Sequence, residues 1–351
     1  MGARLIDFGV TLLAVLLAMV VGMVVIGVQG HDPLEVLGVL LSETLAQPLG
    51  LGQVLFKTTT LSFTGLAAAF AFRAGLFNIG GEGQLYLGAF TAALAGLALP
   101  ELAPPVVAIP IVVSAAMVGG ALAAVIPGAL KATRGTHEVI STMMMSFILL
   151  AAVNYFLSWI RIPETVRTAE LPAGSRLMLL SAIAPSLRGS DGNAALFLAI
   201  LASAAVLFVL VRTRAGYELR AVGSSPPAAE YGGIDVRRRV MLALVGSGAL
   251  AGLGGVNFVM GSPGYFEQNF APYQGYLGIA VALLARNQPL AVVPAAFLFA
   301  VLAEGGQAIQ QFVPREIGDI LQAVVIVFVV VGARILEVAR KRRQQRRVAH
   351  A

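Results

Sequence analysis

The chain has 351 residues, of which 58% are hydrophobic and only 12% are charged. A water-soluble domain carries about twice that charged fraction, so the composition excludes a soluble globular protein. The formal net charge is +6, and the absence of cysteine excludes disulfides and thiolate chemistry. Apolar runs of about 20 residues, the length of a spanning helix, recur along the chain. Because these runs are continuous rather than alternating, they predict an all-α polytopic membrane protein rather than a barrel.

We expect about ten transmembrane helices, separated by stretches that carry proline, glycine or charge. The first run is too long for the core of a signal peptide, so it is expected to be a retained anchor. The whole chain, 1–351, is therefore predicted to form a single transmembrane domain. The ten spans are predicted near 5–28, 55–72, 84–99, 106–130, 138–160, 194–211, 240–260, 275–286, 290–312 and 318–334.

Basic residues decide the expected orientation. With the N-terminus in the cytoplasm, alternating spans place most of the 24 basic residues on the inner side, which predicts N-in and C-in. The arginines of 161–193 are the exception. Five spans in each half would give the halves opposite orientations, as in a 5+5 inverted repeat, although self-similarity between the halves is weak. The basic tail, 335–351, is interpreted as a cytoplasmic stop-transfer and lipid-headgroup cluster and not as a nucleic-acid site.

Motifs for catalysis and nucleotide binding are missing from the sequence. None of the three lysines, Lys57, Lys131 and Lys341, follows a glycine as a phosphate-binding loop requires. The three histidines are far apart, and neither a metal-binding spacing nor a nucleophile elbow occurs. We therefore expect the chain to be no enzyme and to bind no cofactor or metal itself.

The stretch 72–90, FRAGLFNIGGEGQLYLGAF, places Asn78, Glu82 and Gln84 among glycines between two predicted spans. A carboxylate within hydrocarbon costs about 3 kcal/mol, so it normally faces a cavity or a partner. One interpretation is a broken helix that lines a polar pathway. The other is a tight cytoplasmic turn, in which Glu82 begins the third span, is favoured by the helix dipole and pairs with Arg73. The sequence leaves both open.

Other polar residues interrupt the apolar runs. Glu304, Gln307 and Gln310 recur at helical spacing and predict a polar stripe on the ninth span, either a pore lining or an interhelical hydrogen-bonding face. By contrast, Gly248-xxx-Gly252 predicts close helix packing and not a ligand site. The predicted substrate pathway consists of Asn78, Glu82, Gln84, Asn154, Asn257, Glu304 and Gln307.

The segment 212–239 is polar and carries six arginines between two apolar runs. Residues 217–222 are predicted to open a short amphipathic helix, and 228–231 a second one that Gly232 and Gly233 end. Short helices along a membrane surface suit mechanical coupling to a soluble partner, which predicts a cytoplasmic coupling loop. The alternative is a solvated basic loop that only satisfies the positive-inside rule.

These segments resemble the permease subunits of ATP-binding-cassette importers, in the branch that serves simple sugars and nucleosides. The resemblance covers nearly the whole chain, and its first stretch is most similar to the larger of two paired nucleoside permeases. The chain departs from the pattern at His137, where asparagine is common, and at Gln288, where histidine or asparagine is expected. The matching stretches are AGLFNIGGEGQLYLGAF (74–90), KATRGTHEVISTMMMSFI (131–148), RTRAGYELRAVGSSPPAAEYGGI (212–234) and GYLGIAVALLARNQPL (275–290).

The resemblance implies a translocation subunit of the cell (inner) membrane, importing nucleosides or related simple sugars. A second permease, identical or not, would complete the path. The expected partners are a double-cassette ATPase, which would hydrolyse the ATP, and an extracytoplasmic substrate-binding protein. The residues implied to contact the ATPase are Arg214, Tyr217, Glu218, Arg220, Pro226 and Glu230.

The alternative from a different class is a secondary transporter driven by an ion gradient. Glu82 or Glu304 would then be the intramembrane carboxylate that couples ion to substrate. An intramembrane enzyme is a remote third interpretation, because the sequence offers no nucleophile with a matching base.

Overall fold

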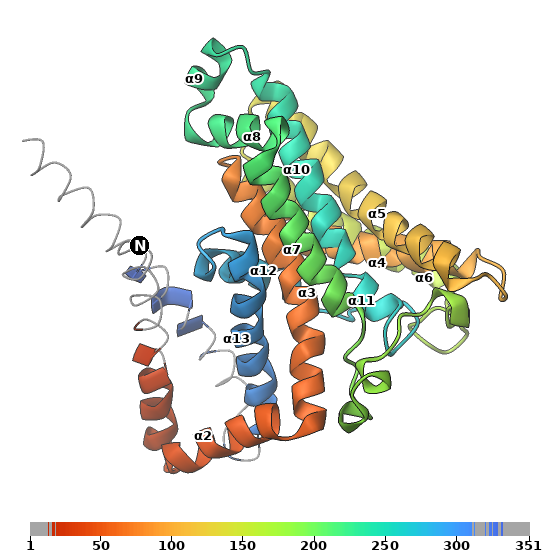
Figure 1. The fold of residues 1–351 in the computed structure, drawn as a ribbon, viewed down its shortest axis with the longest axis vertical. Coiled ribbons are helices and arrows are strands. Elements are labelled where there is room, and N and C mark those ends of the chain that lie inside the picture. Colours follow the sequence, from red (N-terminus) through yellow and green to blue (C-terminus); the bar gives the residue numbers. More distant parts are fainter. Residues whose placement is uncertain are drawn as a thin grey trace, which may run out of the picture. The chain divides into compact units, whose positions relative to one another are not determined.

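The computed structural model describes residues 19–310 continuously and, outside this range, residues 13, 16, 17, 312, 320, 323, 324, 326–328, 331 and 332 (Figure 1). Over these residues the chain is helical, with two isolated bridges, Arg167 to Glu267 and Leu179 to Asn193, as its only β pairing. The all-α prediction is confirmed. The predicted basic tail, 335–351, lies outside the described residues, as does most of the predicted tenth span.

The chain divides into two compact units, one made of residues 1–50 with 301–351 and the other of residues 51–300. In the smaller unit, Asp32 caps a helix that the sequence analysis did not predict, accepting a hydrogen bond of 2.9 Å from the backbone N–H of Leu34. Proline at the first helical position strengthens the same start. The described elements of this unit before residue 48 are a helix at Met19–Val28, α2 (Pro33–Leu41) and a π-helical turn (Ser42–Ala46).

The larger unit holds most of the helices, which run back and forth through it (Figure 1). The unit boundaries fall within α3 and α13. In chain order the elements are α3 (Pro48–Arg73), α4 (Gly81–Leu97), α5 (Pro105–Arg134), α6 (Glu138–Ile160), α7 (Ala195–Arg212), α8 (Arg214–Ser224), α9 (Pro226–Tyr231), α10 (Val236–Leu253), α11 (Val256–Val259), α12 (Gln274–Leu284) and α13 (Pro289–Ala308).

Among the described residues, six helices are long and apolar enough to cross a membrane, against the ten spans predicted. Two predicted spans correspond to shorter elements: α4 has 17 residues and α12 has 11. At 1.5 Å per residue α12 extends roughly 16 Å, about half of a bilayer's hydrocarbon core. The six long elements are α3, α5, α6, α7, α10 continued through α11, and α13.

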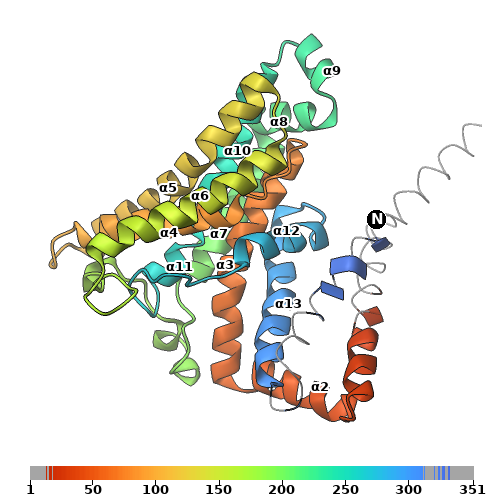
Figure 2. The same cartoon turned by 180° about the vertical axis from the view of Figure 1, so that it is seen from behind.

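Helices α5 and α10 pack with their backbones almost in contact, and α4 lies against both (Figure 2). A Cβ atom on Gly120 of α5 would overlap the carbonyl oxygen of Gly248, and one on Gly252 would overlap that of Ala116. Only glycine permits so close an approach. The packing role predicted for Gly248 and Gly252 is therefore confirmed.

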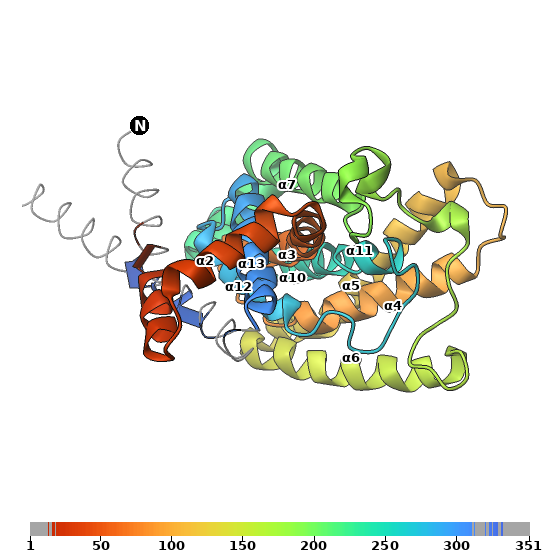
Figure 3. The ribbon, with the colours of Figure 1, turned by 90° about the horizontal axis from the view of Figure 1, so that it is seen from below.

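Helix α6 lies beside α4 and α5, and most of its surface is exposed (Figure 3). Its C-terminal end presents an exposed aromatic cluster of Tyr155, Phe156 and Trp159, whose rings meet edge to face at centroid distances of 5.2–5.9 Å. Helix α3, by contrast, is mostly buried. The helices thus divide into a core and an apolar periphery, as expected when the surrounding solvent is lipid.

The segment between α6 and α7 folds against residues 260–268. The backbone N–H of Leu171 donates to the carbonyl of Gly264 at 2.7 Å, and Arg167 lies 4.5 Å from the centre of the Tyr265 ring. Arg176 forms an ion pair of 2.7 Å with Glu170. Two of the arginines that depart from the charge asymmetry are therefore engaged locally.

Candidate functional site

The predicted coupling loop forms two short helices, α8 and α9, at one end of the larger unit, near the start of α10 (Figure 1). The hydroxyl of Thr213 caps α8 by accepting from the backbone N–H of Gly216 at 3.1 Å, and Ser225 caps α9 in the same way. Gly233, with φ +80°, ends the pair. The prediction of two short helices closed by the glycine pair is confirmed.

Glu218 anchors α8 to its surroundings. Its buried carboxylate accepts a hydrogen bond of 2.7 Å from Arg214, one helical turn away, and forms an ion pair with Arg239 of α10. The hydrogen bond from Arg214 and the charge of Arg239 hold the pKa of Glu218 below its ordinary value, against the desolvation of the carboxyl group. Glu218 is thus ionised near neutral pH and fixes the angle between α8 and α10.

The outer side of α8 and α9 offers side chains to a partner. Tyr217 is 62% exposed and Tyr231 is 98% exposed, and Pro226 and Glu230 are also exposed. A groove of about 520 Å³ lies between the two helices, with Ala221 in its lining. Of the six residues predicted to contact an ATPase, Glu218 is buried and Arg220 is half-buried, and Glu218 supports the helix from inside.

The inner side of α8 packs on the end of α3. A Cβ atom on Gly223 would overlap the carbonyl oxygen of Arg73, and Gly75, at φ +72°, faces Gly223 in turn. Gly216 approaches the carbonyl oxygen of Val209 just as closely. Helix α8 is therefore in backbone contact with the segment that leads from α3 to α4.

This segment, residues 74–80 and termed here the α3–α4 connection, is fixed by a buried amide pair. Asn78 donates to the side chain of Gln84 at 2.8 Å and accepts from it at 3.1 Å. Asn78 also donates to Ser247 of α10 at 2.8 Å, and Ser247 donates to the carbonyl of Ala67 in α3 at 2.7 Å. A fully satisfied buried network of this kind specifies a single arrangement of α3, α4 and α10.

Glu82 stands in the first turn of α4, buried, and its carboxylate binds the start of α12. One oxygen accepts from the backbone N–H of Tyr273 at 2.8 Å and the other from that of Gly275 at 2.7 Å. Charge-assisted bonds to free N–H groups at a helix start are strong. The ion pair considered between Arg73 and Glu82 is replaced by another contact, because Arg73 donates to the carbonyl of Asn287 at 2.9 Å.

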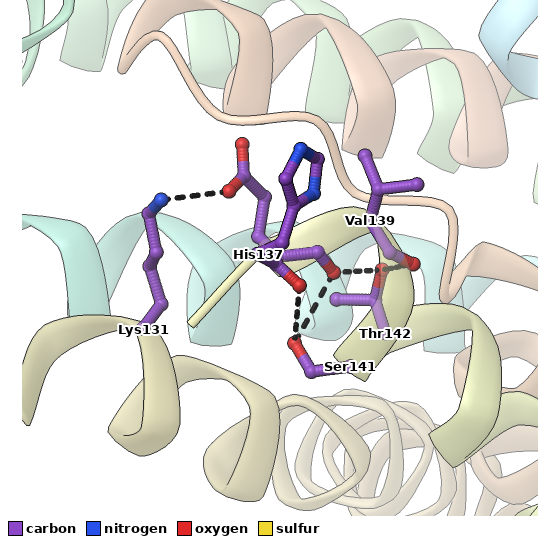
Figure 4. Close-up of polar contacts among 6 residues, drawn as sticks. Lys131, His137, Val139, Ser141 and Thr142 are labelled. Atoms are coloured by element: carbon purple, nitrogen blue, oxygen red, sulfur yellow. Dashed lines mark hydrogen bonds and ion pairs between the residues drawn. The ribbon is translucent and has the colours of Figure 1, made fainter. Parts of the chain in front are cut away.

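Helix α6 holds the same region from the other side. Thr142 accepts from the backbone N–H of Ile79 and Ser146 accepts from that of Gly83, both at 3.2 Å. Figure 4 shows the start of α6, where Lys131 of α5 forms an ion pair of 2.8 Å with Glu138. His137, one of the departures from the family pattern, is the residue at the cap position of α6.

Two further predicted pathway residues make interhelical hydrogen bonds. Asn257 of α11 donates to the carbonyl of Phe56 and to the hydroxyl of Thr60, each at 2.9 Å, and accepts from Asn193. Asn154 of α6 accepts from the hydroxyl of Tyr86 at 2.8 Å. Both side chains are therefore engaged in hydrogen bonds within the larger unit.

Five of the seven predicted pathway residues belong to the larger unit and two to the smaller one. Asn78, Gln84 and the nearby Glu82 gather around the start of α4, whereas Glu304 and Gln307 belong to the smaller unit. Gln307 is exposed there and Glu304 is half-buried.

Several partners of this network were not predicted. Thr142 and Ser146 share one helix face, since they are four residues apart, and this spacing was the available signal. Ser247 stands between two small-residue positions and gave no signal of its own. The role of Arg73 toward Asn287 depends on tertiary structure alone.

Replacing Glu82 by glutamine is expected to lower both uptake and thermal stability. The amide keeps one acceptor but turns an NH₂ group toward one of the two backbone N–H donors of α12. Leaving one buried donor unsatisfied costs about 1–3 kcal/mol. Glu101→Gln is the matched control, because Glu101 is exposed between α4 and α5. Equal melting temperatures and equal uptake in the two variants would contradict a role for the Glu82 contact.

The sequence matches one protein family over residues 50–330, described as branched-chain amino acid transport system / permease component. It is 36% identical to a glucose ABC transporter permease of Haloferax volcanii, over 92% of this chain and 87% of that protein. It is 33% identical to a nucleoside ABC transporter permease of Lactococcus lactis, over 92% of this chain and 90% of that protein. A guanosine ABC transporter permease of Bacillus subtilis is 35% identical, over 93% and 94%. No solved structure matches the chain.

Proposed function

Because the chain belongs to the branched-chain amino acid transport system / permease component family, a family of multi-pass permeases of the cell membrane, we propose that it is the translocation subunit of an ATP-driven importer. The cargo is a nucleoside or a related simple sugar. The observation that carries the proposal is the full-length similarity to nucleoside, guanosine and glucose permeases, together with the apolar helices.

Docking of a separate ATPase is assigned to α8 and α9. Exposed aromatic and charged side chains on both helices support this, as does the anchoring of α8 by Glu218. The arginines of 212–239 support a cytoplasmic position of the segment, by the positive-inside rule. ATP is then bound and hydrolysed by the partner, while the whole chain, 1–351, acts as one permease with its N- and C-termini inside.

The remaining partners follow from the same proposal. A second permease, identical or paired, completes the translocation path, and an extracytoplasmic binding protein delivers the substrate. Alternation between inward and outward states requires that the two states differ in their contacts with the ATPase, because a partner shifts an equilibrium only through differential binding. The pathway residues proposed here are Asn78, Glu82, Gln84, Asn154, Asn257, Glu304 and Gln307.

Uptake into vesicles tests the proposal. Membranes that contain this chain, its partner permease, the ATPase and the binding protein are supplied with a panel of radiolabelled nucleosides and monosaccharides. We expect uptake of one of these classes that requires ATP, is lost without the ATPase and is insensitive to an uncoupler. Uptake that collapses with the uncoupler and survives loss of the ATPase would instead support the ion-driven alternative. For Glu82, a coupling role in that alternative is disfavoured because both of its oxygens are bound by backbone donors.

A further inference from the structure

Helix α12 is held at both ends by residues that flank the α3–α4 connection. At its start, the N–H groups of Tyr273 and Gly275 donate to Glu82, which follows the connection. Just after its end, the carbonyl of Asn287 accepts from Arg73, which precedes the connection. A short stretch of chain is thus bonded to both ends of a complete helix, and a displacement of that stretch is passed to α12 through these three hydrogen bonds.

Helix α12 is short and is bounded by sharp turns of the backbone. It is only 11 residues long, and the residues that bound it adopt left-handed backbone conformations: Tyr273 has φ 65°, Arg286 φ 53° and Asn287 φ 56°. Such conformations are uncommon for residues other than glycine and mark places where the chain changes direction sharply. Large φ/ψ changes at element ends are the usual hinges of rigid-body motion.

Helix α8 touches the same stretch of chain. Gly223, at the penultimate position of α8, lies against the backbone of Arg73, Ala74 and Gly75 with no side chain between them. Backbone-to-backbone contact transmits displacement without the slack of flexible side chains.

We propose that Arg73 is the positioning residue that links α8 to α12, so that movement of α8 by a docked partner is passed through the α3–α4 connection to α12. This rests on the proposed function, in which α8 receives the ATPase. Gly223 supplies the contact through which α8 displaces the backbone of Arg73. The hydrogen bond from Arg73 to the carbonyl of Asn287 then passes this displacement to α12. Glu82 keeps the opposite end of α12 attached to the same segment, so both ends move together.

The functional test separates ATP hydrolysis from uptake. The Arg73→Ala variant is expected to assemble with the ATPase, and the complex is expected to hydrolyse ATP. Uptake is expected to fall about tenfold, a change of the size typical for coupling between two sites. Arg73→Lys, which retains a donor for the Asn287 carbonyl, is expected to restore most of the uptake. The control is Arg134→Ala, an exposed arginine at the end of α5. Uptake by Arg73→Ala equal to that of the control would overturn the proposal. Failure of Arg73→Lys to restore uptake would overturn it as well.

A second measurement follows α12 directly and requires no transport. The chain contains no cysteine, so Ile279→Cys places one thiol on α12, whose rate of labelling is recorded in intact membranes. Gly223→Ala, which forces α8 away from Arg73, is expected to change that rate about threefold, and the change is expected to vanish when Arg73→Ala is combined with it. An equal change with and without Arg73 would overturn the proposal. If the wild-type complex shows no ATP-driven uptake, the transport role fails, and this labelling experiment alone decides on Arg73.

Discussion

A chain in which residues 216–220 are replaced by a flexible Gly/Ser sequence is expected to lose ATP-driven uptake completely while it still enters the membrane. The replacement removes Glu218, and with it the contacts to Arg214 and Arg239 that hold α8 in place. It also removes Tyr217 from the exposed face. A partner would then move a flexible peptide instead of a rigid helix, and the membrane helices would not respond. Uptake and membrane content are measured together.

The control for that experiment is a Gly/Ser replacement of residues 100–102, which are exposed between α4 and α5. This change introduces the same Gly/Ser residues, but it lies beyond the C-terminal end of α4, away from α8. It is expected to leave uptake near the wild-type value. Persistence of uptake after replacement of 216–220 would show that α8 is not the coupling element. Loss of membrane content in that variant would assign the segment to folding rather than to coupling.

Gly252→Leu is expected to abolish accumulation of folded protein. Its Cβ atom would overlap the carbonyl oxygen of Ala116, so α5 and α10 would have to separate along their whole crossing. Overpacking a core with side chains that can rearrange costs about 1–3 kcal/mol, and a clash with backbone has less room to relax. Melting temperature and yield of the detergent-solubilised protein report the loss.

Gly38→Leu is the matched control, because Gly38 is also helical but has no atom within 4 Å of the position that a Cβ would occupy. It is expected to keep the wild-type melting temperature. If Gly252→Leu were as stable as Gly38→Leu, the close packing of α5 on α10 would not be what holds the larger unit together.

Apolar runs located the long helices, but they located the helix ends only where charged residues bound the run. Helix α6 was predicted at 138–160 and found at Glu138–Ile160, because a charged residue bounds the apolar run on each side. Helix α3 begins at Pro48, earlier than predicted, and proline is favoured at the first position of a helix. The predicted span 240–260 is interrupted after Leu253 by two glycines, a break that hydropathy does not register.

The polar cluster could be foreseen in part. Asn78, Glu82 and Gln84 attracted attention because polar groups among apolar residues must find partners. Their partners could not be predicted, since Glu82 and the backbone it binds are 191 and 193 positions apart in the sequence. Every residue except proline has a backbone N–H group, so the sequence does not indicate which of these groups bind Glu82. The local signals of α8 and α9, by contrast, lie within a few residues and were sufficient.

The aromatic end of α6 provides an intrinsic fluorescent probe of how deeply this helix lies in the bilayer. Indole rings favour the headgroup level of a bilayer, where an apolar face and a polar N–H are both accommodated. Trp159 is 68% exposed and is the only tryptophan of the chain, so the intrinsic tryptophan fluorescence reports on one position near the end of α6. Quenching of this fluorescence by groups attached at different positions along the lipid tails therefore measures the depth of the end of α6 in the bilayer, without any engineered label.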